Sequence, residues 1–386
     1  MEKETLTIAF DGKRAMRNLT GLGNYSRLVV ESLAREYPAN RHLLFSPADG
    51  PGNPRTAPLL QLPNVELCLP RGHAPGMLWR TWTMARQLRD AGVSLYHGLS
   101  NEIPLSLRSH GIPSVVTIHD VIYRRMPECY KPVDRMLYDW KYGASCRRAD
   151  RVIAISDATK RDVMDLYGIP EEKIDIIYQG CADIFRHSAT PEEFMKVKET
   201  YRLPDTYLVQ VGTVERRKNL ELAVRALSAL PGHISLVAVG KGGDYRRRMD
   251  ALAAELGVTD RVLFLTDVAF THLPAIYQHA LAIVYPSRYE GFGIPVLEGL
   301  ESRRPVIATP LSSLPEAGGD AAFYTDPDDP RQLAAIVEAI ATGSADTDAH
   351  IAAGLRHASR FANDRMASAI MATYRKVLEN KPANNR

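Results

Sequence analysis

Apolar and polar positions follow a repeating pattern along most of the chain. Short runs of apolar, often β-branched residues alternate with longer stretches in which apolar residues recur at helical spacing. Strands that are apolar throughout are typical of a parallel sheet that helices cover on both faces. The first series predicts strands over residues 6–10, 95–97, 114–118 and 151–155, and helices over 24–37 and 156–168.

This pattern breaks near residue 180, and a second series follows. The segment 179–204 indicates a strand end, an irregular stretch and a short charged helix. Two such series predict two doubly wound, Rossmann-like α/β domains that face a cleft, whereas one large sheet is the less favoured alternative. The second series predicts strands over residues 207–211, 234–239, 262–265, 281–285 and 306–308, with helices near 219, 245 and 294.

The break also gives the expected domain boundaries. We expect one domain over residues 1–182, a linker over 183–204 and a second domain over 205–357. Residues 358–386 predict a C-terminal helix that either caps the second domain or crosses back to the first.

Composition narrows the class of protein. With 45% hydrophobic and 24% charged residues over 386 positions, the chain has the make-up of a globular protein rather than of a disordered or fibrous one. No apolar stretch approaches the roughly 20 residues that cross a bilayer, and the first residues lack the apolar core of a signal peptide. A net charge of +3 is too small to indicate nucleic acid as a partner.

The four cysteines do not indicate a site. Cys68, Cys129, Cys146 and Cys181 lie far apart and form no C-x-x-C pair, so neither a zinc site nor a disulfide framework is expected. Reduced cysteines are usual in cytoplasmic proteins, and we expect a cytoplasmic location.

The strongest candidate chemistry lies in the segment 286–302, where a strand ends and a helix begins. Gly291 and Gly293 let backbone N–H groups approach a ligand, and the helix start favours an anionic group. The carboxylates of Glu290 and Glu298, on either side of this anion site, are good acceptors for sugar hydroxyls. The pattern predicts a nucleotide-sugar ligand. The alternative is that one glutamate complements the helix dipole and the other is solvated.

The sequence from Glu290 to Glu298, E-G-F-G-I-P-V-L-E, resembles the E-x7-E motif of family GT4 (group 1), the retaining glycosyltransferases with the GT-B fold. Further landmarks of that family occur in the family's order, at residues 20–25, 117–120, 149–156, 212–219 and 315–320. The chain is thus similar to bacterial mannosyl- and glucosyltransferases of surface polysaccharide synthesis. The resemblance implies a first Rossmann-like domain for the acceptor and a second for the nucleotide-sugar donor.

The resemblance also implies catalytic roles for Glu290, His119 and Lys218. Lys218, in a basic turn between a strand and a helix, is expected to neutralise charge on the departing diphosphate. Glu290 is expected to bind the donor sugar, and His119 to lie near it. His97 follows another strand and is expected on the acceptor side. The residues expected to bind the donor are Gly21, Gly23, Arg216, Arg217, Gly240, Val268, Gly291, Phe292, Gly293, Ile294 and Glu298.

Each of these assignments has a simpler alternative. The basic turn could be a solvated turn, and either histidine could be hydrogen-bonded locally without touching a ligand. Thr213 stands where the family often has arginine, so whether Arg216 or Arg217 takes that role is open. The glycine turn before the first helix is not a dinucleotide fingerprint, because Ser26 occupies the third glycine position.

We expect no metal and no cofactor. Asp326 and Asp328 resemble the D-x-D metal motif of the other large glycosyltransferase fold, but the proline between them and the Asp-Pro that follows favour a turn. The nucleotide-sugar is expected to enter as a substrate.

The reaction implied by the resemblance is transfer of a hexose, of mannose or glucose type, from a nucleotide diphosphate sugar to a glycan or lipid-linked acceptor. The family retains the anomeric configuration and needs no metal, and GDP-mannose is slightly favoured as donor. The product would be a surface polysaccharide or lipopolysaccharide. A nucleotide-sugar epimerase on the same fold and a non-catalytic nucleotide-sugar binding protein are the alternatives.

Basic charge is concentrated in residues 71–151, which contain 13 Lys and Arg against 7 Asp and Glu. This stretch could touch an anionic membrane, at its inner face, or a lipid-linked acceptor. The favoured alternative is a helix whose aromatic residues pack inward and whose arginines are solvated. The residues concerned are Trp79, Arg80, Trp82, Met84, Arg86 and Arg89.

Overall fold

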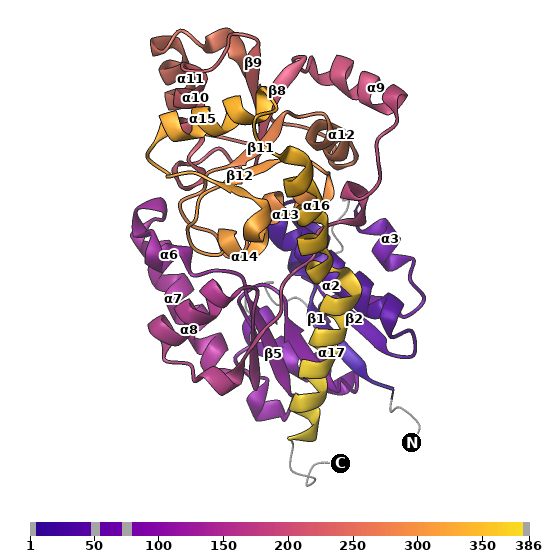
Figure 1. The fold of residues 1–386 in the computed structure, drawn as a ribbon. Helices are drawn as coiled ribbons and strands as arrows, with labels where there is room; N and C mark the ends of the chain where they lie inside the picture. The colour runs from indigo at the N-terminus through magenta and orange to yellow at the C-terminus, as the bar shows by residue number, and fades with distance from the viewer. Residues whose placement is uncertain (1–4, 48–54, 72–78, 381–386) are drawn as a thin grey trace. The chain divides into compact units, whose positions relative to one another are not determined.

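The chain divides into two compact units, each with one parallel sheet (Figure 1). The first unit contains residues 1–179 and 362–386, and the second contains residues 180–361. The prediction of two doubly wound α/β domains is confirmed. The computed structural model describes residues 5–47, 55–71 and 79–380. Residues 72–78 of the basic stretch, the side chain of Trp82 and residues 381–386 of the expected C-terminal segment lie outside this description.

The sheet of the first unit has seven parallel strands in the order β3-β2-β1-β4-β5-β6-β7. These strands are β1 (Thr7–Asp11), β2 (Arg41–Phe45), β3 (Val65–Cys68), β4 (Leu95–Gly98), β5 (Ser114–Ile118), β6 (Arg151–Ala154) and β7 (Ile174–Ile176). The helices are α1 (Lys13–Arg17), α2 (Gly21–Glu36), α3 (Ala57–Leu60), α5 (Met84–Asp90), α6 (Ile122–Arg125), α7 (Pro132–Arg148), α8 (Asp157–Tyr167) and α17 (Asn363–Glu379).

Two sets of helices cover the two faces of this sheet. Alternate side chains of a strand point to opposite faces. Tyr96 and Val116 pack in one apolar cluster with residues of α5, α7 and α8. Their neighbours His97 and Thr117 contact α17 and α2 through hydrogen bonds. Helix α8 begins at the predicted cap, where Thr159 N donates to Ser156 Oγ at 3.0 Å.

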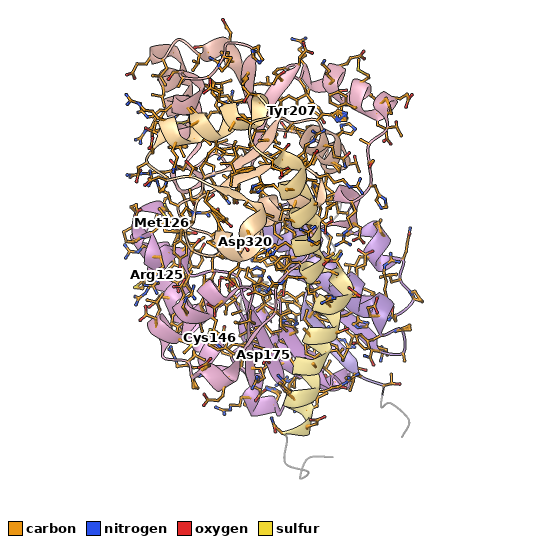
Figure 2. The ribbon with its side chains drawn as sticks, viewed as in Figure 1. Arg125, Met126, Cys146, Asp175, Tyr207 and Asp320 are labelled. Carbon is orange, nitrogen blue, oxygen red and sulfur yellow. The ribbon has the colours of Figure 1, made fainter. Side chains whose placement is uncertain are left out.

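Helix α17 follows the second unit in the sequence but packs against α2 of the first unit. Asp175 on β7, labelled in Figure 2, accepts hydrogen bonds from Thr373 Oγ1 at 2.9 Å and from Lys376 Nζ at 3.1 Å. The buried Tyr374 hydroxyl lies 2.6 Å from His97 Nδ1. The C-terminal helix is therefore part of the first unit's core.

The sheet of the second unit has six parallel strands in the order β10-β9-β8-β11-β12-β13. These strands are β8 (Thr206–Val211), β9 (Ile234–Val239), β10 (Val262–Leu265), β11 (Ala282–Tyr285), β12 (Val306–Ala308) and β13 (Phe323–Tyr324). The helices are α9 (Pro191–Tyr201), α10 (Leu220–Leu227), α11 (Asp244–Glu255), α12 (Leu273–Gln278), α13 (Ile294–Glu301), α14 (Leu314–Gly318), α15 (Pro330–Ala341) and α16 (Thr347–Ala358). Helix α9 lies in the segment expected to be a linker and packs on α12.

In each sheet the chain order reverses once, between β1 and β4 in the first unit and between β8 and β11 in the second. Open α/β sheets bind ligands outside the carboxyl ends of the strands at such a reversal. In the second unit the loops at this place are residues 212–219 and 286–293, which contain Lys218 and Glu290.

The basic stretch follows its favoured alternative only in part. Trp79 is 2% exposed and packs inward, and Arg86 and Arg89 are exposed. Arg80 was expected to be solvated, but its guanidinium turns inward and pairs with Asp11, which is 1% exposed. A buried carboxylate left without a partner would be strongly destabilising, which accounts for the inward turn of Arg80. No helix in the described part of the chain is long and apolar enough to cross a membrane.

Candidate functional site

The candidate site of the second unit is built from the loops that follow β8 and β11. The backbone N–H of Arg288 in one loop donates to the carbonyl of Arg217 in the other at 2.9 Å, which joins the two loops directly. Gly293 precedes α13 with φ +113°, and a Cβ there would lie 2.7 Å from Leu314 Cδ2. Only glycine fits this backbone conformation without strain.

Three charged side chains and a tyrosine meet at this place. Glu290 Oε1 lies 2.6 Å from Lys218 Nζ and 2.7 Å from a terminal nitrogen of Arg217. Tyr285, the last residue of β11, donates its hydroxyl to Glu290 Oε1 at 3.1 Å and accepts a hydrogen bond from Lys218 Nζ. Arg217 also pairs with Glu215 at 2.6 Å. The structure therefore brings the expected sugar-binding carboxylate and the expected diphosphate-binding cation into one cluster.

The cluster keeps its charges although it is buried. Burial raises the pKa of Glu290, but Lys218 and Arg217 outweigh burial and lower that pKa to about 2. Burial lowers the pKa of Arg217, but the carboxylates of Glu290 and Glu215 more than compensate. For Lys218 burial dominates and its pKa is lowered, although Glu290 opposes that shift. An anionic ligand that replaced Glu290 beside these cations would meet positive charge already stripped of water.

The glycine-rich loop around Glu290 is held by two serines after β12. Ser312 Oγ accepts a hydrogen bond from the Glu290 N–H at 2.9 Å. Ser313 Oγ donates to the carbonyls of Glu290 at 3.0 Å and Phe292 at 2.9 Å. The Phe292 ring is 2% exposed and packs edge-on against Phe361 at 5.3 Å. Phe292 thus anchors the loop from inside the unit, while the backbone of the loop remains in place for a ligand.

The second glutamate of the motif lies apart from the first. Glu298, in α13, accepts a hydrogen bond from the Tyr277 hydroxyl of α12 at 2.8 Å. Burial raises the pKa of Glu298 to about 7, and the hydrogen bond from Tyr277 only partly offsets this. Among the described residues no hydrogen bond or ion pair joins Glu298 to Glu290. The motif therefore places one carboxylate with a lowered pKa and one with a raised pKa on the same loop and helix.

Glycines also shape the loops after β8 and β9. Gly240 has φ +154°, and a Cβ there would lie 1.9 Å from the carbonyl oxygen of Gly212. The N–H of Val214 donates to the carbonyl of Lys241 at 2.8 Å. Gly240 is thus required for the loop that carries the basic turn to pack on its neighbour.

The other expected donor-binding residues of this unit differ in their exposure to solvent. Arg216 is exposed, whereas the side chain of Arg217 is only 12% exposed, so the two arginines of the turn differ in environment. Val268 is half-buried in the loop after β10, and Ile294, which is also half-buried, begins α13. Gly291 is buried next to Glu290.

In the first unit the expected glycines lie at the start of α2. Gly23 donates its N–H to Asn18 Oδ1 at 3.2 Å, and a Cβ there would lie 1.9 Å from the Asn18 carbonyl oxygen. Gly21 is exposed, with open space where a Cβ would stand. Gly23 is therefore explained by the local turn, whereas Gly21 leaves its backbone accessible.

His119 follows β5 and is 5% exposed. Its Nε2 lies 2.8 Å from the carbonyl of Leu99 and therefore donates, so Nδ1 is the acceptor nitrogen. Its N–H donates to Asn101 Oδ1 at 2.7 Å, and Tyr25 packs edge-on against the ring at 4.6 Å. Burial lowers the pKa of His119 to about 4. The ring is thus a fixed, neutral group with one nitrogen left for a hydroxyl.

His97 lies deeper in the first unit than the expected acceptor role requires. It is fully buried on β4, with Nδ1 2.6 Å from the Tyr374 hydroxyl and Nε2 2.8 Å from Thr117 Oγ1. Burial lowers its pKa to about 3. Both ring nitrogens are occupied inside the unit, so the structure gives His97 a bridging position between the sheet and α17.

Two polar groups at the sheet edges are not indicated by the sequence pattern. Tyr285 reads as an ordinary apolar strand residue, yet its hydroxyl contacts both Lys218 and Glu290. Asp11 ends β1 at the reversal of the first sheet and pairs with Arg80. Both are the last residues of strands beside the reversal in strand order, and this position could have indicated them as site residues.

The residues Asp326 and Asp328 form a turn, as expected. Asp326 Oδ1 accepts a hydrogen bond from the N–H of Asp328 at 2.8 Å, and Asp328 pairs with Arg288. Within residues 5–47, 55–71 and 79–380, no group of three or more His, Cys, Asp or Glu side chains is arranged to bind a metal ion.

Comparison with known proteins gives the same pattern in both units. A family model described as "Glycosyltransferase Family 4" matches residues 26–182, and one described as "Glycosyl transferases group 1" matches residues 191–354. The sequence is 29% identical to O-antigen chain mannosyltransferase B of Escherichia coli over 75% of this chain and 76% of that protein. It is 27% identical to the O-antigen chain mannosyltransferase RfbU of Salmonella typhimurium over 60% of this chain and 63% of that protein.

Solved structures share the fold at lower identity. HepE of Anabaena, in complex with UDP and glucose, superposes with a TM-score of 0.76 at 20% identity, covering 96% of this chain and 100% of that one. WaaG, described as a glycosyltransferase involved in lipopolysaccharide biosynthesis, gives a TM-score of 0.67 at 19% identity, covering 96% of this chain and 99% of that one. At these identities the likeness is one of fold.

Proposed function

The chain belongs to the glycosyltransferases of group 1 and family 4, and from this premise we propose that it moves mannose from GDP-mannose to a growing surface glycan. The family expected from the motifs and the expected hexosyltransferase activity are confirmed by the family models and by relatives named as mannosyltransferases. What we propose beyond this is the identity of the sugar, of the nucleotide and of the acceptor. The O-antigen mannosyltransferases among the relatives support mannose and a lipopolysaccharide product.

The observation that carries this proposal is the cluster of Lys218, Arg217 and Glu290 at the reversal between β8 and β11. The diphosphate of a nucleotide-sugar carries negative charge, which two cations with little exposure to water would bind. The carboxylate between them would then be released to accept hydroxyl protons of the hexose. One rearrangement of three side chains would thus convert an internally neutralised cluster into a site for both parts of the donor.

We propose that the reaction proceeds on one face of the sugar with retention at the anomeric carbon. The bond between that carbon and the diphosphate oxygen breaks, and a bond to the acceptor oxygen forms on the same face. The acceptor proton passes to the departing diphosphate, which leaves as GDP. No metal is needed in this proposal, because Lys218 and Arg217 stabilise the negative charge that develops on the leaving group.

Arg217 rather than Arg216 is proposed to act with Lys218. Arg217 shares Glu290 with Lys218 and is held by Glu215 and by the carbonyl of Tyr289 at 2.7 Å. A cation fixed in this way costs little reorganisation when charge develops beside it. The exposed Arg216 has no comparable support.

In the first unit we propose that His119 accepts a hydrogen bond from a donor-sugar hydroxyl through Nδ1. The ring is kept neutral by burial and is oriented by Leu99, so its free nitrogen has a fixed direction. For an O-antigen product the acceptor would be a lipid-linked glycan, and we propose peripheral contact with the inner face of an anionic membrane.

The test is a panel of nucleotide-sugars assayed for nucleotide release, with and without a lipid-linked acceptor extract. The expected result is GDP release from GDP-mannose that accelerates with acceptor and yields a product with retained configuration. Preferential use of another donor would refute the mannose proposal. Conversion of the sugar without nucleotide release would identify an epimerase, and binding without turnover would identify a non-catalytic protein.

A further inference from the structure

Helix α7 carries an apolar stripe on its exposed face. Val133, Met136, Leu137 and Trp140 are 70%, 71%, 41% and 53% exposed. Their spacing of three and four residues places all four side chains along one side of the helix. A single exposed apolar residue is ordinary, but a contiguous row of four indicates a contact surface.

The charges on this face are of one sign. Every exposed residue from Lys131 to Arg148 is either apolar or basic, and the basic ones are Lys131, Arg147 and Arg148. The two acidic residues of the helix, Asp134 and Asp139, are only half-exposed at its sides. The segment 122–148 contains seven Lys and Arg against three Asp and Glu. An apolar row flanked by cations, with a tryptophan in it, is the composition of helices that lie in the interface of an anionic membrane.

The opposite side of α7 fixes the helix to the unit. Cys146, labelled in Figure 2, is fully buried in the apolar cluster of the first unit. The hydroxyl of the buried Ser145 accepts a hydrogen bond from the N–H of Ile103 at 3.2 Å. The stripe is therefore presented by a helix that is already folded, and docking would not have to order it.

We infer that the exposed face of α7 docks the protein on an anionic lipid surface. In this arrangement the row from Val133 to Trp140 enters the apolar boundary of the leaflet, and Lys131, Arg147 and Arg148 contact lipid phosphates. The inference rests on the proposed function in one respect: that function explains why the protein would be at a membrane. The docking itself needs neither donor nor acceptor.

Charge argues against a second copy of this chain as the occupant. A two-fold contact through the stripe would be self-complementary and would repeat the same residues on both sides. Antiparallel helices centred between Met136 and Leu137 would bring Lys131 of one copy beside Lys141 of the other. Like charges would then meet at both ends of the contact without an exposed acidic residue of α7 to compensate.

The experiment is co-sedimentation of the full chain with two kinds of vesicle, phosphatidylcholine alone and phosphatidylcholine mixed with phosphatidylglycerol. Binding is expected to the anionic vesicles at about 0.05 M salt and to weaken at about 0.5 M salt. Trp140→Ser is expected to reduce the partition coefficient by about tenfold, because an interfacial tryptophan is lost. Arg147→Gln and Arg148→Gln are expected to reduce it by about fivefold each.

Matched controls use the same residue types elsewhere. Met195→Ser removes an apolar side chain that is 49% exposed on α9, and Arg86→Gln and Arg89→Gln remove exposed charges from α5. These variants are expected to bind vesicles as the unchanged protein does. Donor hydrolysis without vesicles is expected to be equal in all variants, which separates loss of docking from loss of fold or of the proposed activity.

Trp140→Phe provides a second measurement. It should keep most of the vesicle binding but lose the blue shift of tryptophan fluorescence that membrane entry causes. The inference is overturned if Trp140→Ser binds anionic vesicles normally. It is also overturned if the α5 variants lose binding instead, or if Trp140→Ser only converts a dimer into a monomer.

Discussion

The two sheets carry different polar groups at their carboxyl edges. In the second unit the edge between β8 and β11 holds ionised side chains, with Glu290 between Lys218 and Arg217. In the first unit β1 also ends in an ion pair, between Asp11 and Arg80, but the neighbouring β4 and β5 carry His97 and His119, both buried and both kept neutral by burial. Buried charge is stable only while it is paired, so the second edge is built to exchange partners with a charged ligand. His97 is instead hydrogen-bonded through both ring nitrogens inside the unit, and His119 keeps one neutral nitrogen that suits a ligand without charge.

Removing a cation from the edge of the second sheet is expected to have the largest effect. Lys218→Ala is expected to lower turnover by roughly 10²–10³-fold, because charge on the leaving diphosphate loses its nearest partner. Arg217 still pairs with Glu290 in this variant, so the protein is expected to fold. The measurement is nucleotide release under saturating donor, with thermal unfolding as the check on the fold.

Lys196→Ala on α9 is the control for this variant, because it removes an exposed lysine of the same unit. A Lys218→Ala enzyme that turned over within a few-fold of normal would place the leaving-group role on another residue.

The next largest effect is expected from the carboxylate. Glu290→Gln keeps the shape of the side chain but removes its charge, and turnover is expected to fall about 10- to 100-fold, as for loss of a charged hydrogen bond. The double variant Lys218→Ala, Glu290→Gln should lose less than the two single effects combined, because the residues share one cluster. Full additivity in that comparison would show that they act separately.

The fold could be predicted from the sequence because both sheets are parallel and are buried on both faces. Strands β5, β9, β10 and β12 have the predicted bounds, because short runs of apolar residues are typical of buried parallel strands. Strands β2, β3 and β7 were not predicted, because His42, Glu66 and Asp175 interrupt their apolar runs. Helix α7 escaped the pattern for the opposite reason. Its apolar positions lie on both the buried and the exposed side, so no single stripe marks it as amphipathic.

The sequence predicted which residues belong to the candidate site but not which of them contact one another. The motif places Glu290 after one strand and Lys218 after another, and only the strand order makes these loops neighbours. The roles of these residues and of His119 stay predictions. Tyr285 carries no local signal for its contact with the cluster. His97 has the same strand-end position as His119, yet the packing of α17 against it, from far along the chain, encloses it.

Buried histidines and the buried Glu298 should make opposite contributions to the pH dependence of stability. The folded first unit keeps His97 and His119 neutral, whereas the unfolded chain protonates them near pH 6.5, so this unit loses stability as the pH falls from about 6.5. Glu298 keeps its proton in the folded state up to about pH 7, whereas the unfolded chain ionises near 4.5. Its contribution is full below pH 4.5 and is lost as the pH rises toward 7. Each group gives a slope of up to about 1.4 kcal/mol per pH unit.

Hydrogen exchange of each unit at pH 5 and pH 6.5, corrected for intrinsic rates, measures these slopes separately. Glu298→Gln removes the opposing carboxyl and leaves His279 and His357, whose pKa values burial also lowers, so the second unit is expected to lose more stability from pH 6.5 to pH 5 than before. The pH dependence of the first unit is expected to stay unchanged. If Glu298→Gln left the pH dependence of the second unit unchanged, the raised pKa of Glu298 would not contribute to its stability.

The smallest effect is expected from the contact that encloses His97. Tyr374→Phe removes the hydroxyl 2.6 Å from Nδ1 and leaves a buried nitrogen unpaired, at a cost of about 1 kcal/mol in the free energy of unfolding. Denaturant unfolding measures this change, and donor hydrolysis should be unaffected. If Tyr374→Phe lowered donor hydrolysis while the protein stayed folded, His97 would have a direct part in the reaction.

The return of α17 to the first unit has a consequence for biosynthesis. On the ribosome, α17 leaves the exit tunnel only after residues 180–361, because it follows them in the sequence, and those residues can begin to fold first. Until then the nascent first unit lacks the helix that donates to Asp175 and packs on α2, so its apolar surface stays open to chaperones. The amino-terminal unit, although synthesised first, would thus be the last to reach its native state.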